Sequence, residues 1–118
     1  MSGRRALAEQ QGRRGETFAI WWLRLQGWRI LDRRVKTPRG EVDIVARRGR
    51  TVCFFEVKWR RNASEHALSI DAYRLRRVAA AAESLASRYA RSGETLRIDV
   101  LLLAPRRFPR HIVNAWMP

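Results

Sequence analysis

Two stretches of the chain repeat apolar residues at spacings of three and four positions, the period of an amphipathic helix. The first runs from about Ala6 to Gln26 and is followed by Gly27, a residue suited to end a helix. The second runs from about Ile70 to Arg91 and carries one apolar stripe, made of Leu75, Val78, Ala79, Ala82, Leu85, Ala86 and Tyr89. We therefore predict two helices, each with one face toward a core.

Runs of apolar and β-branched residues predict strands between and after these helices. Three of them lie between the helices: Trp28–Val35, Glu41–Arg47 and Thr51–Trp59. The nearly all-apolar run Leu96–Ala104 is typical of a strand buried on both faces, and Ile112–Trp116 predicts a short last strand. The order αβββαβ(β) predicts an α/β fold, a mixed β-sheet flanked by helices, in a single domain over residues 1–118.

The turn between the second and third strands predicts how these strands pair. Gly49-Arg50 forms a two-residue loop, because glycine suits the first central position of a type II′ hairpin turn. The resulting register places Asp43 opposite Glu56, with Cβ atoms roughly 5 Å apart on one face. Lys58 shares that face because side chains alternate along a strand. A slip of one residue would send Asp43 to the other face.

Two carboxylates and an ammonium on one face have two explanations. Close carboxylates repel each other, and a divalent cation relieves the repulsion. Hard oxygen ligands together with a substrate phosphate suit Mg²⁺, which polarises the phosphate and activates water. Lys58 could orient that water or offset charge at phosphorus. A structural ion pair of Lys58 with Glu56 or Asp43 explains the same residues, and spacing alone leaves both explanations open.

The net charge says more about the binding partner than the overall composition does. The 118 residues carry 25 basic and 11 acidic side chains, a net charge of +14, spread over both halves of the chain. This surplus favours a polyanionic partner, nucleic acid above all, over a merely solvated basic surface. Arginine dominates, since Lys36 and Lys58 are the only lysines.

Other features of the chain favour a cytoplasmic protein that does not enter a membrane. No apolar run approaches the ~20 residues of a membrane span, and the basic N-terminal segment lacks the apolar stretch of a secretory signal. The single Cys53, in an apolar run, excludes an internal disulfide and is typical of a buried thiol in a reducing compartment.

Several short motifs, in this order along the chain, carry a resemblance to a known family. They are Gly12-x-x-Gly15-Glu16-x-x-Ala19, Gly27-Trp28-x-Ile30-Leu31, Gly40-Glu41-Val42-Asp43-Ile44-Val45-Ala46, Phe55-Glu56-Val57-Lys58-x-Arg60 and Arg97-x-Asp99-Val100. Together they resemble the YraN family of the restriction-endonuclease-like superfamily. The resemblance implies the PD-(D/E)xK nuclease fold, which archaeal Holliday-junction resolvases share.

The resemblance also implies roles for individual residues. Asp43 and Glu56 would bind Mg²⁺ or Mn²⁺, the Val57 carbonyl would complete the metal site, and Lys58 would be the catalytic lysine. Glu16 matches an acidic position that reaches the metal through water. The function implied is a metal-dependent endonuclease acting on DNA, including branched or single-stranded DNA. The alternative is a non-catalytic nucleic-acid-binding module that retains the nuclease core.

Arginines near the site are the candidate phosphate contacts. The start of the second helix usually carries a lysine in this family, and here it carries arginine instead. We assign phosphate contacts to Arg60, Arg74 and Arg77. Arg74, Arg77, Arg88 and Arg91 form one helical stripe, for which a solvated helix face is the competing interpretation.

Further polar residues receive structural rather than catalytic roles. Glu41 is interpreted as a rim residue of the site. Asp99 interrupts an apolar strand and is predicted to pair with Arg97 or Arg47. His66 and His111 have no partners at metal-ligand spacing and are predicted to lie on the surface.

For the tryptophans, the sequence leaves a functional and a structural alternative open. Trp21 and Trp22 are adjacent, so one of them either marks a homodimer contact or packs on a second side of the helix. Trp59 either stacks on a base or packs under the 60–69 loop.

Overall fold

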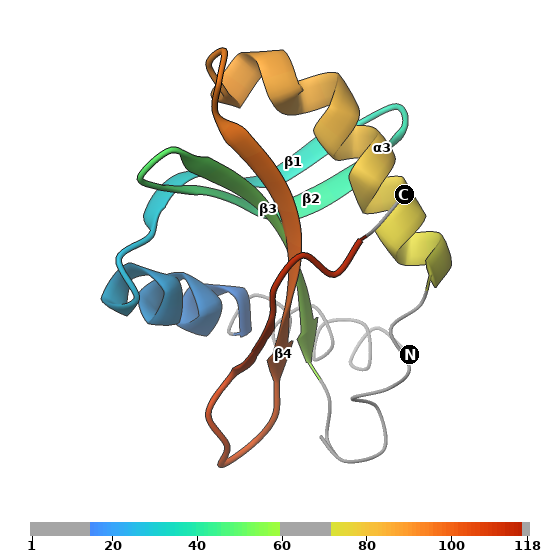
Figure 1. Ribbon diagram of the computed structural model, residues 1–118. Helices are drawn as coiled ribbons and strands as arrows, with labels where there is room; N and C mark the ends of the chain where they lie inside the picture. The colour runs from blue at the N-terminus through green and yellow to red at the C-terminus, as the bar shows by residue number, and fades with distance from the viewer. Residues whose placement is uncertain (1–14, 60–71, 117–118) are drawn as a thin grey trace.

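One mixed β-sheet organises the protein. The computed structural model describes residues 15–59 and 72–116, and in this part of the chain five strands form a sheet of order β1-β2-β3-β4-β5. The strands are β1 (Arg29–Thr37), β2 (Gly40–Arg48), β3 (Thr51–Trp59), β4 (Thr95–Leu103) and β5 (Arg110–Ile112). A helix over residues 15–25 and α3 (Ala72–Tyr89) flank the sheet (Figure 1).

The connections between strands explain the mixed sheet. β1, β2 and β3 form an antiparallel meander, and β5 is antiparallel to β4. β3 and β4 are parallel, so the chain must cross over between them, and α3 lies on this crossover. The predicted α/β class and element order are confirmed. The predicted helix positions 6–14 and the 60–69 loop lie outside the described residues.

The two hairpin turns fix the register of the meander. Gly49 has a φ of +61°, and Arg48 pairs with Thr51, as the predicted two-residue loop requires. In the β1–β2 turn, the Thr37 hydroxyl accepts hydrogen bonds from the backbone N–H groups of Arg39 and Gly40. The register that the sequence predicts for β2 and β3 is therefore present from the turn as far as the pair Ile44 and Phe55.

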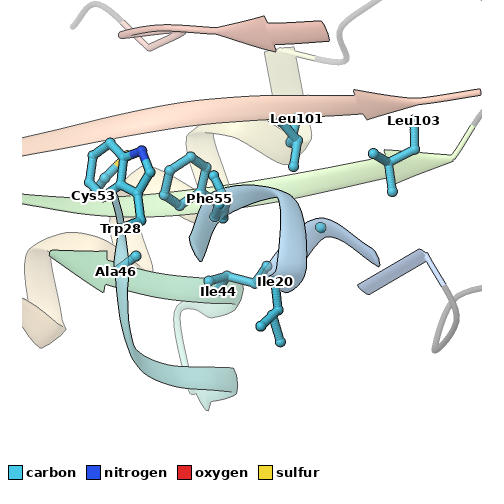
Figure 2. Packing of buried hydrophobic residues seen from close by; sticks show 10 residues of the cluster. Ile20, Trp28, Ile44, Ala46, Cys53, Phe55, Leu101 and Leu103 are labelled. Carbon is cyan, nitrogen blue, oxygen red and sulfur yellow. The ribbon is translucent and has the colours of Figure 1, made fainter. Parts of the chain in front are cut away.

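Two apolar cores lie on opposite faces of the sheet. Helix 15–25 covers the first, where Ala19, Ile20 and Leu23 pack against the sheet. Figure 2 shows the Trp28 and Phe55 rings side by side, with centroids 5.2 Å apart and nearly perpendicular planes. The second core lies beneath α3 and contains Val35, Val42, Val45, Val52, Phe54, Val78, Ala81, Ala82 and Leu85. The sheet is thus the middle layer between two helices.

Helix α3 approaches β2 closely at Gly40. A Cβ atom built on Gly40 would lie 2.2 Å from the carbonyl oxygen of Arg77, so only glycine fits beneath the helix. This contact sets the height of α3 above the start of β2. It also fixes where the arginines of the first turns of α3 lie relative to Asp43.

The C-terminal segment differs from its prediction. The last strand is Arg110–Ile112 rather than the expected Ile112–Trp116. Residues after it leave the ladder, and the Ala115 N–H donates to the Ile98 carbonyl oxygen of β4. The strand is displaced because its register is set by pairing of His111 with Leu101 rather than by the apolar residues that follow.

Asp99 is the centre of a buried polar cluster. Its carboxylate accepts hydrogen bonds from Arg97, from the backbone N–H of Asn114 and from Nε2 of His111 at 2.6 Å. Burial raises its pKa, but these hydrogen bonds outweigh burial and leave the pKa well below its usual range. The predicted surface position of His111 is therefore wrong, because β5 brings this side chain onto Asp99. His66 lies outside the described residues.

Arg47 has a different partner from the one predicted. Its guanidinium bonds the Glu94 carboxylate and donates to the Tyr89 carbonyl oxygen at 2.9 Å. It therefore links β2 to the turn between α3 and β4, while Arg97 alone of the two predicted arginines pairs with Asp99. Cys53 is buried, as predicted, and burial raises the pKa of its thiol.

Candidate metal-binding active site

The sheet is distorted at the position of Asp43. β1 and β2 pair on both sides of Arg34 and Asp43, but the pairing skips these two residues. Arg34 has a φ of 53°, a left-handed backbone that is uncommon for residues other than glycine. On the other side, the β2–β3 ladder ends at Ile44 and Phe55. Both ladders are thus interrupted beside Asp43.

This distortion corrects the predicted geometry of the two carboxylates. Asp43 does not form a regular strand pair with Glu56. Its Oδ2 atom accepts a hydrogen bond of 2.8 Å from the backbone N–H of Val57, so the side chain reaches into the opening between β2 and β3. The predicted convergence still occurs, because both carboxylates line one pocket of about 170 Å³ together with Glu41, Arg74, Arg77 and Val78.

Glu56, which lines this pocket, forms a buried ion pair with Lys58. Their exposed fractions are 4% and 5%, and Lys58 Nζ lies 3.2 Å from Glu56 Oε1. Arg74 adds a second cation 3.4 Å from the same oxygen. The ion pair that the sequence left as an alternative is therefore present. Even so, Glu56 Oε1 is buried and accepts no hydrogen bond, since neither cation meets hydrogen-bond geometry.

Burial and charge act together on Asp43. Burial, followed by the neighbouring Glu56 carboxylate, raises its pKa to about 7, and the hydrogen bond from the Val57 N–H opposes the rise. The carboxylates of Glu16 and Glu41 add smaller contributions in the same direction. The pocket therefore holds negative charge that its own hydrogen bonds do not fully stabilise.

Glu16 belongs to the neighbourhood of the site but is held by another residue. Nε of Arg34 donates to both oxygens of its carboxylate, at 2.9 and 2.8 Å. Arg34 was not singled out from the sequence. Nothing in its local pattern marks a left-handed backbone, since the residues that favour it are glycine and asparagine.

The predicted phosphate-binding arginines divide into two groups. Arg74 and Arg77 line the pocket, as does Glu41, whose side chain is exposed at its rim. Arg88 instead lies over the ring of Tyr89, 5.9 Å from its centroid. The arginine stripe thus contributes two residues to the site. Arg60 lies outside the described residues.

The donor set fits a hard divalent cation that also binds water and substrate. Within residues 15–59 and 72–116, no three His, Cys, Asp or Glu side chains are grouped closely enough to hold a metal by themselves. Asp43 and Glu56 therefore supply two carboxylates. Mg²⁺ is commonly held by one or two carboxylates, with waters and phosphate oxygens completing its octahedron. The buried Oε1 of Glu56, which accepts no hydrogen bond, is suited to such an ion.

The fold is that of a restriction-endonuclease-like protein. A solved structure supports this class: the Holliday junction resolvase Hjc from Archaeoglobus fulgidus superposes with a TM-score of 0.62 at 25% sequence identity. The match covers 87% of this chain and 72% of the resolvase.

Comparison with related sequences assigns the chain to a family. The family model described as "Uncharacterised protein family UPF0102" matches residues 15–103, and the chain belongs to this family, as the YraN resemblance implied. A UPF0102 protein of Sphingopyxis alaskensis is 65% identical over 114 residues, covering 97% of this chain and 98% of the relative. One of Erythrobacter litoralis is 61% identical over 115 residues, covering 98% and 99%.

Proposed function

We propose that this protein is a divalent-metal-dependent endonuclease that hydrolyses phosphodiester bonds in DNA. The observation that carries the proposal is Glu56 Oε1, which is buried, accepts no hydrogen bond and lines the same pocket as Asp43. Buried carboxylate oxygens normally accept hydrogen bonds, whereas Lys58 and Arg74 supply this oxygen with positive charge but no hydrogen bond. A Mg²⁺ or Mn²⁺ ion would satisfy it.

Each residue has a role that follows from its position. Asp43 and Glu56, with the Val57 carbonyl, would hold the ion, which supplies Lewis-acid activation of phosphate and water. Lys58, 3.2 Å from Glu56, would orient the attacking water and offset charge at phosphorus. Arg74 and Arg77 would bind the flanking phosphates from the rim. Glu16 would act from outside the direct ligands, and Arg60 is a further proposed phosphate contact.

DNA is the proposed substrate, in branched or single-stranded form. The support is the likeness to a Holliday junction resolvase and a net charge of +14. We also propose a homodimer for cuts in two strands, one domain over residues 1–118, and a cytoplasmic location consistent with the single thiol. In the described residues, no helix is long and apolar enough to cross a membrane.

A second candidate is a non-catalytic nucleic-acid-binding module. The observation that favours it is the contact of Lys58 and Arg74 with Glu56, together with that of Arg34 with Glu16. In this alternative, the protein's own cations neutralise the carboxylates. It predicts salt-sensitive DNA binding that no divalent ion changes.

Cleavage assays with single variants test the proposal. Asp43→Ala, Glu56→Ala and Lys58→Ala should each reduce metal-dependent cleavage of DNA by about 100-fold or more, because each removes a group that acts on the transition state. Linear, single-stranded and junction DNA should be compared with Mg²⁺, with Mn²⁺ and with EDTA. Glu83→Gln, an exposed carboxylate of α3 outside the pocket, is the matched control.

Thermal unfolding separates loss of metal from loss of fold. Mn²⁺ at about 100 times its Kd should stabilise the wild type by about 2.7 kcal/mol and leave Asp43→Asn unchanged. Undiminished cleavage by all three alanine variants, or equal Mn²⁺ stabilisation of wild type and Asp43→Asn, would contradict the proposed metal site.

A further inference from the structure

A second cavity, separate from the proposed active site, has a different character. It is a groove of about 1080 Å³ whose surface is mostly apolar. Three segments distant in sequence build it: helix 15–25, the end of β3, and the loop 104–109 between β4 and β5. Figure 1 shows the end of β3 and this loop at the same end of the molecule. The described lining residues are Gly15, Phe18, Trp59, Ala104, Pro105, Arg106, Arg107 and Phe108.

Three aromatic side chains remain exposed in this groove. Phe18, Trp59 and Phe108 have exposed fractions of 49%, 38% and 84%. Phe108 stands against Trp22, with ring centroids 5.8 Å apart, and a Cβ atom on Gly15 would touch the Trp59 ring at 3.6 Å. Phe108 and Trp59 therefore each have a packing neighbour on one side, while part of all three rings faces solvent. Such surfaces on a soluble protein are typical of binding sites.

The positive charge of the groove indicates which kind of apolar ligand fits it. Its described lining contains Arg106 and Arg107, both exposed, and no acidic residue. A ligand that pairs flat apolar rings with negative charge matches this lining, and unpaired nucleotides have this chemistry. Stacking of bases on aromatic side chains beside a basic path is how proteins hold single-stranded DNA.

The groove and the proposed active site meet the end of β3 on opposite faces of the strand. Lys58 and Trp59 are consecutive residues, so their Cα atoms lie about 3.8 Å apart, and their side chains point to opposite faces. A DNA strand bound in the groove would therefore lie across β3 from Lys58.

We propose that Phe18, Trp59 and Phe108 form a stacking site for unpaired DNA bases on the face of β3 opposite the proposed active site. This inference rests on the proposed function for its polynucleotide substrate and narrows the substrate to DNA with an unpaired segment. Arg106 and Arg107 bind the backbone of the same strand.

Binding without cleavage tests the stacking site. Fluorescence anisotropy in EDTA should compare a single-stranded oligonucleotide, the same sequence as duplex, and a single strand with consecutive abasic positions. The wild type should prefer the intact single strand. Phe108→Ala and Trp59→Ala should each weaken that binding by about 5- to 50-fold, while leaving the abasic strand bound as by wild type. Phe108→Trp should retain full affinity because it keeps an aromatic plane.

The controls separate stacking from other effects. Leu25→Ala removes an apolar side chain about as exposed as Phe108 that does not line the groove, and it should leave affinity unchanged. Equal losses on intact and abasic strands would overturn the proposal. So would a wild-type dimer that dissociates in Phe108→Ala with unchanged DNA affinity, because the groove would then be a contact between copies. Since EDTA is present throughout, failure of the metal site leaves these results unaffected.

Discussion

Arg34 combines an unfavourable backbone with a position beside the proposed active site. A left-handed conformation costs a residue with a Cβ atom roughly 1–2 kcal/mol, and Arg34 adopts it in the middle of β1. Its exposed ion pair with Glu16 returns at most about 1 kcal/mol. The distortion is therefore better explained by what it permits, since it interrupts the ladder where Asp43 leaves the regular sheet.

A pair of substitutions isolates this backbone strain. Arg34→Ala and Arg34→Gly both remove the guanidinium, so both lose the contact with Glu16. The glycine variant should nevertheless be more stable than the alanine variant by about 1 kcal/mol, because glycine accepts positive φ without a steric penalty. Urea denaturation at pH 7 measures the difference. An alanine variant as stable as the glycine variant would show that β1 relaxes once the guanidinium is gone.

Single residues differ in how far the sequence predicts them. Asp43, Glu56 and Lys58 are predictable because a hairpin loop of known length fixes which residues share a face. The distortion that turns Asp43 toward the Val57 N–H is not, because it depends on an arginine in a glycine-like conformation. His111 is missed for a related reason. The fully buried Asp99 has more acceptor sites than one arginine fills, and that was the available indication of a second donor.

Contacts between elements depend on small residues at close approaches. Gly40→Ala should destabilise the protein by about 1–3 kcal/mol, because the added Cβ atom would overlap the Arg77 carbonyl and push α3 away from β2. Gly15→Ala is the matched control. Its Cβ atom would meet neighbours at 3.5 and 3.6 Å, which is ordinary van der Waals contact. Because alanine favours a helix more than glycine does, the variant should be as stable as wild type or more stable by up to about 1 kcal/mol. Thermal denaturation that ranks the two variants in the opposite order would refute this packing argument.

The link between β2 and the α3–β4 turn depends on pH. Hydrogen bonds from Arg47 and from the Arg91 N–H lower the pKa of Glu94 to about 2, below its usual 4.5. A carboxyl group with a lowered folded-state pKa stabilises the fold above about pH 4.5 and loses that contribution as the pH falls toward 2.

Glu94→Gln should therefore destabilise the protein at pH 7 and have progressively less effect below pH 4.5. Chemical denaturation at a series of pH values measures the difference between variant and wild type. Glu83→Gln, whose carboxylate is mostly exposed, is the control. A difference that stays constant down to pH 2 would exclude the ionised carboxylate as its source.

Elements were predicted well where local chemistry sets their ends. The β2–β3 hairpin is confirmed because Gly49 determines its turn, and helix 15–25 ends at Gly27, where the Trp28 N–H donates to the Leu23 carbonyl. The last strand was misplaced because its ends are set by pairing with β4, a contact between strands that local patterns do not encode.

At the scale of the whole molecule, the order of helices and strands predicted the fold class, and the net charge predicted a nucleic-acid partner, which stays a proposal. Neither predicted the second cavity. The groove joins three segments whose apolar residues look like ordinary core positions in sequence. In the sequence, Phe108 is one residue of a proline-bounded loop, whereas in the fold it packs against Trp22 and lines the same groove as Trp59. Convergence of distant segments is a property of the tertiary structure.

The kink in β1 also affects how copies of the protein meet. Among the described residues β1 pairs with β2 alone, and an open strand edge invites pairing with another chain. Here the edge is bent twice, at the register shift between Ile30 and Asp32 and at the left-handed Arg34, and it carries exposed Arg29 and Lys36. Charge and irregularity both disfavour strand addition, so this sheet resists edge-to-edge aggregation, and two copies that associate should do so through another surface.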